Sequence, residues 1–366
     1  MSDRLIKPAR HLVRCLMVAG ALNIGAASAE TNRDTYIYSA NQGGFDLSAF
    51  RIDHESGRLV PLNGAPFAAG RFPVSVTVSP NGDFVYVTNQ GSESISAFRL
   101  DRQRQTLLKV AGSPFPAGRY PDALTISPDG QFLYVTSEDD DRVKVFGVDR
   151  STGRLKDAGI TVSTGHHPIA VSMTPNGREA FVANYNDNDI QAYKVDQATG
   201  ALQPVGRRMA TDEHPISVAV SEDSQFVYVA NYGSTTVSAF AIDAGTGELR
   251  EIDGSPYLAG AKPYAVTVDS TEHHVYVVNW AGNDLTAFDM DRASGTLRES
   301  AGSPYKTDWF PYAVVVNPGD HFLYVTNNGA NSLSGYAIDP HSGMLRLLKN
   351  FPVPVDAGPY GLAIGF

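Results

Sequence analysis

The side chains best suited to acid–base chemistry in this sequence lie directly before prolines. His167 precedes one proline, and Glu213 and His214 precede another, 47 residues further along the chain. An imidazole can accept or donate a proton near neutral pH, so histidines at matching positions are candidates for a general base. We therefore expect His167 or His214 to activate a water molecule, with Glu213 beside the second of them.

Basic residues occupy the same region in other copies of the pattern. Arg71 and Arg119 lie two residues before a proline, and Lys262 lies directly before one. A fixed cation can stabilise the negative charge that develops on a carbonyl oxygen, or it can bind a carboxylate. We expect Lys262 or Arg119 to polarise a substrate carbonyl, and Arg71 to contact the substrate.

Aromatic side chains at neighbouring positions of the pattern could hold a ring-shaped ligand. They are Tyr232, Tyr264, Trp280, Tyr312 and Tyr360. Such rings bring a large apolar face and a polar tip to a binding site, which suits a sugar ring. The alternative is structural: the aromatic residues pack the wide end of each structural unit, and the histidines only fill loops.

Acidic side chains complete the polar groups of this region. Asp122 follows a proline and Glu138 begins the acidic run 138–141, and we interpret both as substrate contacts. The run is either a solvated loop tip or a site for a cation or polyol, with Asp187 and Asp189 near it in the second case. It lacks a recognised spacing of metal ligands. No Ser-His-Asp, Cys-His, HExxH, P-loop or CxxCH pattern is present, so we expect no metal and no cofactor.

All of these positions belong to one sequence repeat. Seven aromatic residues lie 47 or 48 residues apart, and each is followed 15 residues later by an aspartate. The aromatic residues are Tyr38, Tyr86, Tyr134, Phe181, Tyr228, Tyr276 and Tyr324, and the aspartates are Asp53, Asp101, Asp149, Asp196, Asp243, Asp291 and Asp339. A fixed period of this length indicates small β-units that cannot bury their faces alone. The sequence therefore predicts an all-β, seven-bladed β-propeller with four-stranded antiparallel blades.

The second repeat shows the strands of one blade. Residues 74–78, 84–88, 94–100 and 107–110 are rich in β-branched and aromatic residues, which predicts four strands, a to d, from the inside outwards. The turn between strands c and d commonly reads Asp-x-x-Ser/Thr-Gly. We therefore interpret the seven repeated aspartates as turn-capping groups and not as catalysts.

The two ends of the array predict how the ring closes. The array begins with a strand b at residues 36–40 and ends with a strand a at residues 360–364. The C-terminal strand should therefore complete the first blade, which leaves only short sheet edges exposed.

One face of the ring should carry the functional site. The loops from strand d to a and from b to c lie on the same face and vary between repeats, and variable loops on a fixed scaffold usually carry binding sites. The candidate residues above fall in these loops. An asparagine ends strand b in six of the seven repeats, and Ser137 replaces it in the seventh. We interpret these asparagines as bonding the loop backbone.

Residues 1–29 have the features of a secretory signal peptide. Four basic residues precede an apolar run that is too short to cross a bilayer, and Ala27-Ser28-Ala29 is a small-x-small cleavage sequence. We expect a mature propeller domain of residues 30–366 in the periplasm or outside the cell. Cleavage would also remove the only cysteine, Cys15.

The mature chain would be acidic. Residues 30–366 hold 25 basic and 38 acidic residues, a net charge of −13. Such a charge disfavours nucleic acid and anionic membranes as partners. We expect a monomer without a membrane span.

The repeat closely resembles that of the seven-bladed lactonase-like propeller family, which is also described by its YVTN repeats. The resemblance lies in Tyr-Val-Thr-Asn at residues 86–89 and 324–327 and in Ser-Pro-Asp-Gly at residues 127–130, and it covers roughly residues 36–366. The family includes bacterial propeller-type 6-phosphogluconolactonases and fungal carboxymuconate cyclases. The resemblance implies the fold and a lactonase-like activity.

At the positions of the family's site residues, the chain departs from the lactonase and cyclase branches. Ile169, Ile216-Ser217 and Tyr232 fall where those branches carry His, Arg-His and Glu. The departures point away from a sugar phosphate, and we expect a hydrolase that opens a small sugar or organic-acid lactone. The alternative is a non-catalytic YVTN propeller that binds a protein or glycan partner through its variable face. A third hypothesis is a subunit that partners a redox enzyme.

Overall fold

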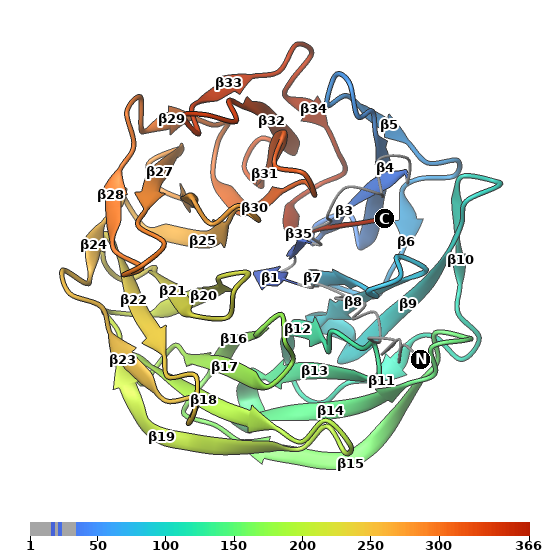
Figure 1. The fold of residues 1–366 in the computed structure, drawn as a ribbon. Helices are drawn as coiled ribbons and strands as arrows, with labels where there is room; N and C mark the ends of the chain where they lie inside the picture. The colour runs from blue at the N-terminus through green and yellow to red at the C-terminus, as the bar shows by residue number, and fades with distance from the viewer. Residues whose placement is uncertain (1–15, 19–20, 24–33) are drawn as a thin grey trace, which may run out of the picture.

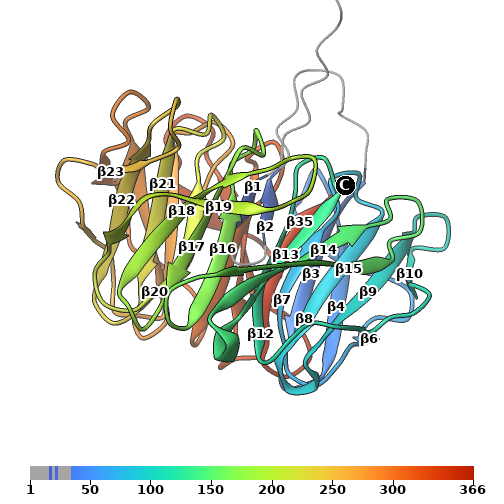
Figure 2. The ribbon, with the colours of Figure 1, turned by 90° about the horizontal axis from the view of Figure 1, so that it is seen from below.

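The computed structural model describes residues 16–18, 21–23 and 34–366, and residues 34–366 form a ring of seven antiparallel blades (Figures 1 and 2). The predicted all-β, seven-bladed β-propeller is therefore confirmed. Within the described residues the only helical segments are two short 3-10 turns, η1 (Gln90–Ser92) and η2 (Glu138–Asp140).

Each blade contributes one strand to four concentric positions. The innermost strands are β35 (Pro359–Gly365), β7 (Pro73–Val78), β12 (Pro121–Ile126), β16 (Pro168–Met173), β20 (Pro215–Val220), β25 (Pro263–Val268) and β30 (Pro311–Val316). The second strands are β3 (Thr35–Asn41), β8 (Phe84–Asn89), β13 (Phe132–Ser137), β17 (Glu179–Asn184), β21 (Phe226–Asn231), β26 (His274–Asn279) and β31 (Phe322–Asn327). The third strands are β4 (Asp46–Ile52), β9 (Ser94–Asp101), β14 (Arg142–Val148), β18 (Asp189–Val195), β22 (Thr236–Ile242), β27 (Asp284–Met290) and β32 (Ser332–Ile338).

The outermost strands occur in two forms. In blades 3 and 4 they are continuous, as β15 (Leu155–Ser163) and β19 (Leu202–Ala210). In the other five blades the outer edge is divided, and a cis X-Pro bond lies between its two segments. The first segments are β5 (Leu59–Pro61), β10 (Thr106–Lys109), β23 (Leu249–Glu251), β28 (Leu297–Glu299) and β33 (Leu345–Leu347). The second segments are β6 (Phe67–Ala68), β11 (Phe115–Pro116), β24 (Tyr257–Leu258), β29 (Tyr305–Lys306) and β34 (Val353–Pro354).

The repeated aromatic residues join neighbouring blades. All seven are at most 1% exposed. Four of their hydroxyls, those of Tyr86, Tyr228, Tyr276 and Tyr324, donate to the backbone oxygen of the glycine in the c-to-d turn of the next blade, at 2.8 to 3.4 Å. The period of the repeat thus places a hydrogen-bond donor on one blade opposite an acceptor on the next.

The repeated aspartates cap turns, as predicted. Each accepts a hydrogen bond from a backbone N–H two or three residues further on. Hydrogen bonds from side chains and backbone N–H groups of the turn favour the charged carboxylate and hold the pKa of all seven aspartates below its usual value. The carboxylates therefore serve the scaffold.

The asparagines that end the second strands are buried hydrogen-bonding groups. Asn279, for example, donates to Asp284 and Thr286 of strand β27 at 2.9 Å each, and it accepts from the backbone N–H of Gly260 at 3.1 Å. Asn89 and Gly70 make the corresponding contact in blade 2. The interpretation that these side chains bond the loop backbone holds for Asn89, Asn184 and Asn279, and their bonds go to the d-to-a loop and not to the predicted b-to-c loop.

The C-terminal strand completes the first blade, as predicted. β35 pairs antiparallel with β3, and Tyr38 lies opposite Ala363. Leu362, Ala363 and Ile364 are fully buried. The ring therefore closes by joining residues from the two ends of the chain.

The signal peptide remains a prediction, because its cleavage sequence at residues 27–29 lies outside the described residues. Within residues 1–29 the structure describes a short hairpin, β1 (Leu16–Val18) paired with β2 (Ala21–Asn23), beside the innermost strands (Figure 1). Across the described residues there is no helix of the length and apolarity needed to span a bilayer.

Candidate functional site

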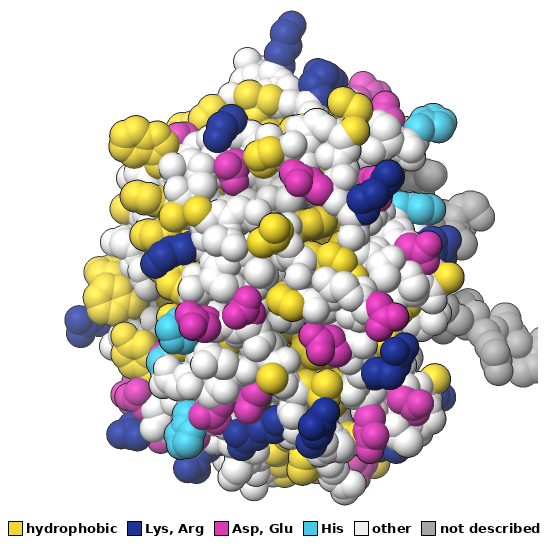
Figure 3. Space-filling view, turned by 90° about the vertical axis from the view of Figure 1, so that its left-hand side faces the viewer, with side chains coloured by type: hydrophobic (Ala, Val, Ile, Leu, Met, Phe, Trp, Pro, Cys, Tyr) yellow, Lys and Arg dark blue, Asp and Glu magenta, His cyan; other side chains and the backbone are white. Residues whose placement is uncertain are grey.

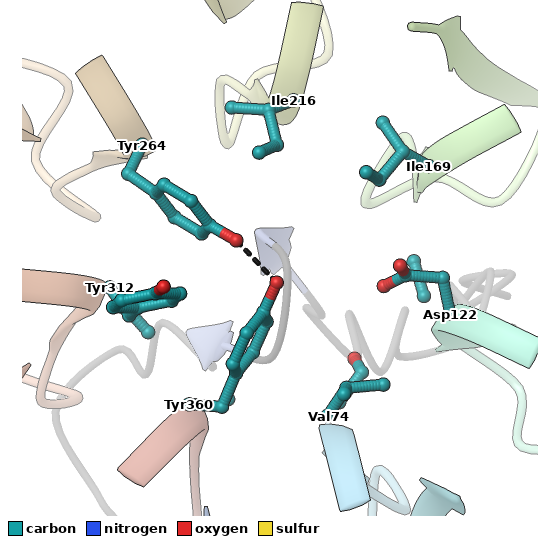
Figure 4. A pocket seen from close by; sticks show the side chains of 11 residues that line it. Val74, Asp122, Ile169, Ile216, Tyr264, Tyr312 and Tyr360 are labelled. Atoms are coloured by element: carbon teal, nitrogen blue, oxygen red, sulfur yellow. Dashed lines mark hydrogen bonds between the residues drawn. The ribbon is translucent and has the colours of Figure 1, made fainter. Parts of the chain in front are cut away.

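A pocket opens at the end of the central channel where the innermost strands begin (Figure 4). Its cavity volume is about 30 Å³, and it opens to solvent. The second residue of every innermost strand lines it: Val74, Asp122, Ile169, Ile216, Tyr264, Tyr312 and Tyr360. The pocket is therefore built from one equivalent position in all seven blades, and its chemistry depends on which residue each blade places there.

A β-bulge turns these residues towards the channel. The pairing between the first two strands of each blade shifts by one residue directly after the starting proline, as between Pro73 and Ser75. The extra residue is left out of the regular ladder, and bulges commonly re-aim a side chain in this way. Proline has no backbone N–H to donate, and it is tolerated here because it is the first residue of the strand.

The residue before each of these prolines forms the rim of the pocket. In all seven blades it has a positive φ between 50° and 67°, and its backbone oxygen accepts a hydrogen bond from the loop that follows the second strand. His167, His214 and Lys262 occupy this position in blades 4, 5 and 6. Because Phe72, Tyr120, Phe310 and Gly358 have the same conformation, the conformation belongs to the scaffold and not to the chemistry of one side chain.

Two carboxyl groups meet in the pocket wall. Asp122 lines the pocket, and Glu138 lies behind it with 7% of its surface exposed. The two carboxyl groups hydrogen-bond each other, and the Gln90 amide donates to Asp122 at 3.0 Å and to Glu138 at 3.4 Å. The solvated-loop-tip interpretation is therefore wrong for Glu138.

The pair holds a proton at neutral pH. Burial raises the pKa of Asp122. Burial, followed by the hydrogen bond and charge of Asp122, raises the pKa of Glu138 to about 10. Two adjacent carboxyl groups cannot both ionise cheaply, so one proton remains on the pair. One carboxylate is then available as a base and one carboxylic acid as a donor.

Three tyrosines form the wall opposite. The hydroxyls of Tyr264 and Tyr360 hydrogen-bond each other near the channel axis and face Asp122 across the pocket (Figure 4). Tyr312 packs on both rings, with centroids 4.3 and 4.6 Å away. Burial raises the pKa of Tyr264 and Tyr360 well above the usual value, so both hydroxyls keep their protons. One hydroxyl proton forms the hydrogen bond between the two tyrosines. The other hydroxyl proton is then free to be donated to a ligand.

Side chains from adjacent blades pair around the rim. In four successive seams, the residue after the second strand of one blade contacts the pre-proline residue of the next. Glu138 Oε2 lies 3.3 Å from His167 Nε2. The rings of Tyr185 and His214 stack at 4.4 Å. The two remaining pairs are Tyr232 with Lys262, whose Nζ is 4.6 Å from the ring centroid, and Trp280 with Phe310, stacked at 4.9 Å.

The remaining candidate residues lie outside the pocket lining. Arg119 is exposed and pairs with Asp140 at 2.9 Å. Arg71 is exposed beside the Phe72 ring, and the Glu213 side chain is exposed. Neither predicted histidine lines the pocket, although His167 reaches it through Glu138.

No metal site is visible in the described part of the chain, where no cluster of three or more His, Cys, Asp or Glu side chains could hold an ion. Asp187 and Asp189, which would have supported a cation site, instead lie 2.8 and 3.5 Å from Arg208.

The fold and the pocket together define a closed seven-bladed propeller with a pocket at one mouth of its channel. The family model described as lactonase, 7-bladed beta-propeller, matches residues 64–171, 162–262 and 256–358. The chain therefore belongs to this family, as the resemblance of its repeats predicted. No curated protein matches the sequence significantly.

Solved structures with the same fold are only distantly related in sequence. A 6-phosphogluconolactonase candidate from Bacteroides uniformis superposes with a TM-score of 0.80 at 18% identity, covering 91% of this chain and 100% of the other. The periplasmic gluconolactonase of Pseudomonas aeruginosa gives a TM-score of 0.76 at 22% identity, covering 91% of this chain and 99% of the other. A protein from Lactobacillus plantarum gives 0.76 at 19% identity, covering 92% and 100%. These likenesses establish the fold, and family membership supports a lactonase-like function.

Proposed function

We propose that this protein hydrolyses a small, uncharged sugar or organic-acid lactone in the channel pocket. The observation that carries the proposal is the Asp122 carboxyl group facing the paired hydroxyls of Tyr264 and Tyr360 across an otherwise largely apolar space. A base and a hydrogen-bond donor on opposite sides of one pocket are the two groups that ester hydrolysis needs.

The chemistry assigns each group a step. The free tyrosine proton hydrogen-bonds the lactone carbonyl oxygen and stabilises the charge that develops there. The carboxylate of the Asp122–Glu138 pair takes a proton from a water molecule, whose oxygen attacks the carbonyl carbon. When the ring C–O bond breaks, the pair returns a proton to the leaving oxygen, and the product is the open hydroxy acid.

The charge of the pocket supports an uncharged substrate. No basic side chain is among the residues that line it, and Asp122 is its one acidic residue. Arg119 is bound to Asp140, and Lys262 lies on the rim over Tyr232. A phosphate or carboxylate on the lactone would therefore enter without a counter-charge, beside an ionised carboxyl pair.

The first prediction concerns Asp122. Replacing Asp122 by Asn removes the base, and we expect the rate of acid release from neutral lactones to fall about 10²- to 10⁴-fold, the range for loss of a general base. A pH-stat measures this above the spontaneous rate. Asp139→Asn is the matched control, because Asp139 is an exposed acid of the neighbouring loop. Unchanged hydrolysis by Asp122→Asn would remove the pocket from the reaction.

The second prediction concerns Tyr360. Tyr360→Phe keeps the ring and removes one of the paired hydroxyls, so we expect kcat to fall about a hundredfold, as for loss of one oxyanion donor. The KM should change little, because the lost bond acts mainly in the transition state. Steady-state kinetics on the same lactones test this, and a rise in KM at constant kcat would contradict it.

The site of action is a separate part of the proposal. Residues 1–29 have signal-peptide features, and one structural relative is by name a periplasmic enzyme. We expect N-terminal sequencing of the exported protein to begin at Glu30. A protein that stays in the cytoplasm with residues 1–29 attached would contradict the proposed export and leave the proposed hydrolysis untouched.

The second candidate function is a non-catalytic propeller that binds a glycan or protein. The exposed aromatic side chains Trp309 and Phe310, 67% and 39% exposed, favour it. If no lactone is hydrolysed above the spontaneous rate, this alternative takes the place of the first.

A further inference from the structure

A line of aromatic rings leads from the pocket to the rim. The ring centroid of Tyr264, in the pocket, lies 5.7 Å from that of Tyr232, and Tyr232 lies 6.1 Å from Trp280. Trp280 stacks on Phe310 at 4.9 Å with an interplanar angle of 19°. Lys262 Nζ lies over both Tyr232 and Trp280, 4.6 and 5.6 Å from their centroids. The rings form one continuous line of contacts across blades 5, 6 and 7.

This line of rings is confined to one side of the pocket mouth. After their second strands, blades 2 and 3 hold Gln90 and Glu138, which form the polar network around Asp122 together with His167, whereas blades 4, 5 and 6 hold Tyr185, Tyr232 and Trp280. Large hydrophobic side chains gather along the left-hand edge in Figure 3, which is the face that carries the pocket. The mouth therefore has a polar side that carries the base and an aromatic side that extends outwards.

From this asymmetry we infer a second subsite, on Tyr232, Lys262, Trp280 and Phe310, that binds a glycosyl unit attached to the lactone. The inference rests on the proposed function and narrows its substrate class to glycosylated aldonolactones, that is, oligosaccharides oxidised at the reducing end. The lactone ring occupies the pocket, and the next sugar residue lies on the aromatic rim.

The chemistry of the rim suits a sugar better than an apolar ligand. Aromatic faces pack against the C–H faces of a pyranose, while the Lys262 ammonium group, which is exposed, keeps N–H donors for hydroxyl groups.

Kinetics with matched substrates test the subsite. We compare glucono-1,5-lactone with the lactones of cellobionic, maltobionic and melibionic acids, and we expect at least one disaccharide lactone to have a kcat/KM about tenfold higher, equivalent to roughly 1.4 kcal/mol of binding. Trp280→Ala should abolish this advantage, so that the disaccharide lactones and glucono-1,5-lactone have about the same kcat/KM. Trp309→Ala, an exposed tryptophan outside the line of rings, is the matched control and should keep it.

Fluorescence provides a test that does not depend on catalysis. The chain has two tryptophans, Trp280 and Trp309, so Trp309→Phe leaves Trp280 as the only emitter. Its emission should change and saturate with cellobiose at concentrations where glucose has no effect, and Trp280→Phe should give no change.

The outcomes separate the subsite from the proposed function. Hydrolysis of glucono-1,5-lactone without any disaccharide preference, or a Trp280 signal indifferent to disaccharides, would overturn the subsite and leave the lactonase proposal intact. Disaccharide binding at Trp280 without hydrolysis of any lactone would keep the subsite as a glycan site and overturn the lactonase proposal.

Discussion

Glu138 shows what one buried residue adds to this pocket. Its carboxyl group hydrogen-bonds that of Asp122 on one side and contacts His167 on the other. The His167 side chain is 31% exposed. The three groups thus connect the pocket to solvent through titratable contacts. In the proposed hydrolysis, we expect His167 to hold Glu138 in position beside Asp122.

The raised pKa of Glu138 makes folding stability depend on pH. Its folded value of about 10 is above its usual value of 4.5, so between these values the folded chain binds a proton that the unfolded chain has released. Stability contributed by the protonated form is complete below pH 4.5 and declines as pH rises towards 10. Glu138→Gln cannot ionise. We expect its stability advantage over the unmodified protein to grow as pH rises above 4.5, by up to about 1.4 kcal/mol per pH unit.

Urea unfolding at several pH values measures this difference. The gain should vanish as pH falls towards 4.5, where Glu138 is protonated in both states. Asp139→Asn should show no such trend, because Asp139 is exposed. A constant difference between Glu138→Gln and the unmodified protein across the whole range would contradict the buried, protonated state of Glu138.

For single residues, the sequence shows which positions of the seven repeats are equivalent, but it does not show which side chains contact each other. The repeat correctly placed Asp122, Tyr264, Tyr312 and Tyr360 in the entries to the innermost strands, and all four line the pocket. It gave no sign that the residue after one second strand meets the pre-proline residue of the next blade. Gln90 occupies the position of Glu138 in the preceding repeat, and the sequence did not identify it as a residue of the pocket wall.

The innermost strand of each blade begins irregularly, and this irregularity positions the residues that line the pocket. Its bulge, its opening proline and the left-handed residue before that proline recur in all seven blades. Non-glycine residues at positive φ carry a conformational cost, and six of the seven positions are not glycine. The hydrogen bonds from the adjacent loop hold this conformation. The chain thus fixes seven side-chain positions and leaves their identity open to variation.

Strand limits were largely readable from the sequence, because β-branched alternation and turn residues agree in every repeat. Residues 74–78 and 84–88 correspond to β7 (Pro73–Val78) and β8 (Phe84–Asn89). The bulge was not readable, since it depends on the pairing register and not on composition. The divided outer strands were likewise missed in the five blades that have them.

The asparagine at the end of a second strand should be important for stability. Asn279→Ala removes two bonds to β27 and one from Gly260, and it leaves the Thr286 and Asp284 side chains without a buried donor. We expect a loss of about 2–4 kcal/mol, given about 1 kcal/mol per bond and the added cost of unsatisfied groups. Equilibrium denaturation tests it, with the exposed Asn63→Ala as control. A loss as small as that of the control would contradict the role.

The whole molecule depends on contacts that connect its two ends. Tyr324 of the seventh blade donates to Gly57 of the first, a separation of 267 residues, in the same way that Tyr86 donates to Gly153. The ring closure therefore reuses an ordinary contact between blades. β35 adds a complete strand to that closure, and an Arg102 nitrogen donates to the backbone oxygen of Phe366 at 2.6 Å. Every blade then has two neighbours, and no blade face is left without a partner.

Removal of the closing strand should unfold the ring at this seam. A variant that ends at Gly358 lacks Leu362, Ala363 and Ile364, all fully buried, and exposes the edge of β3. Burial of the two large side chains alone contributes about 3–6 kcal/mol, a large part of the usual 5–15 kcal/mol of a domain. We expect a much lower melting temperature and rapid proteolysis. Arg102→Ala removes the contact to Phe366 together with the bonds of Arg102 to Asp83 and Asn81, and should cost only about 1–2 kcal/mol. A truncated chain that melts cooperatively at the temperature of the intact protein would show that the blades do not need a closed ring.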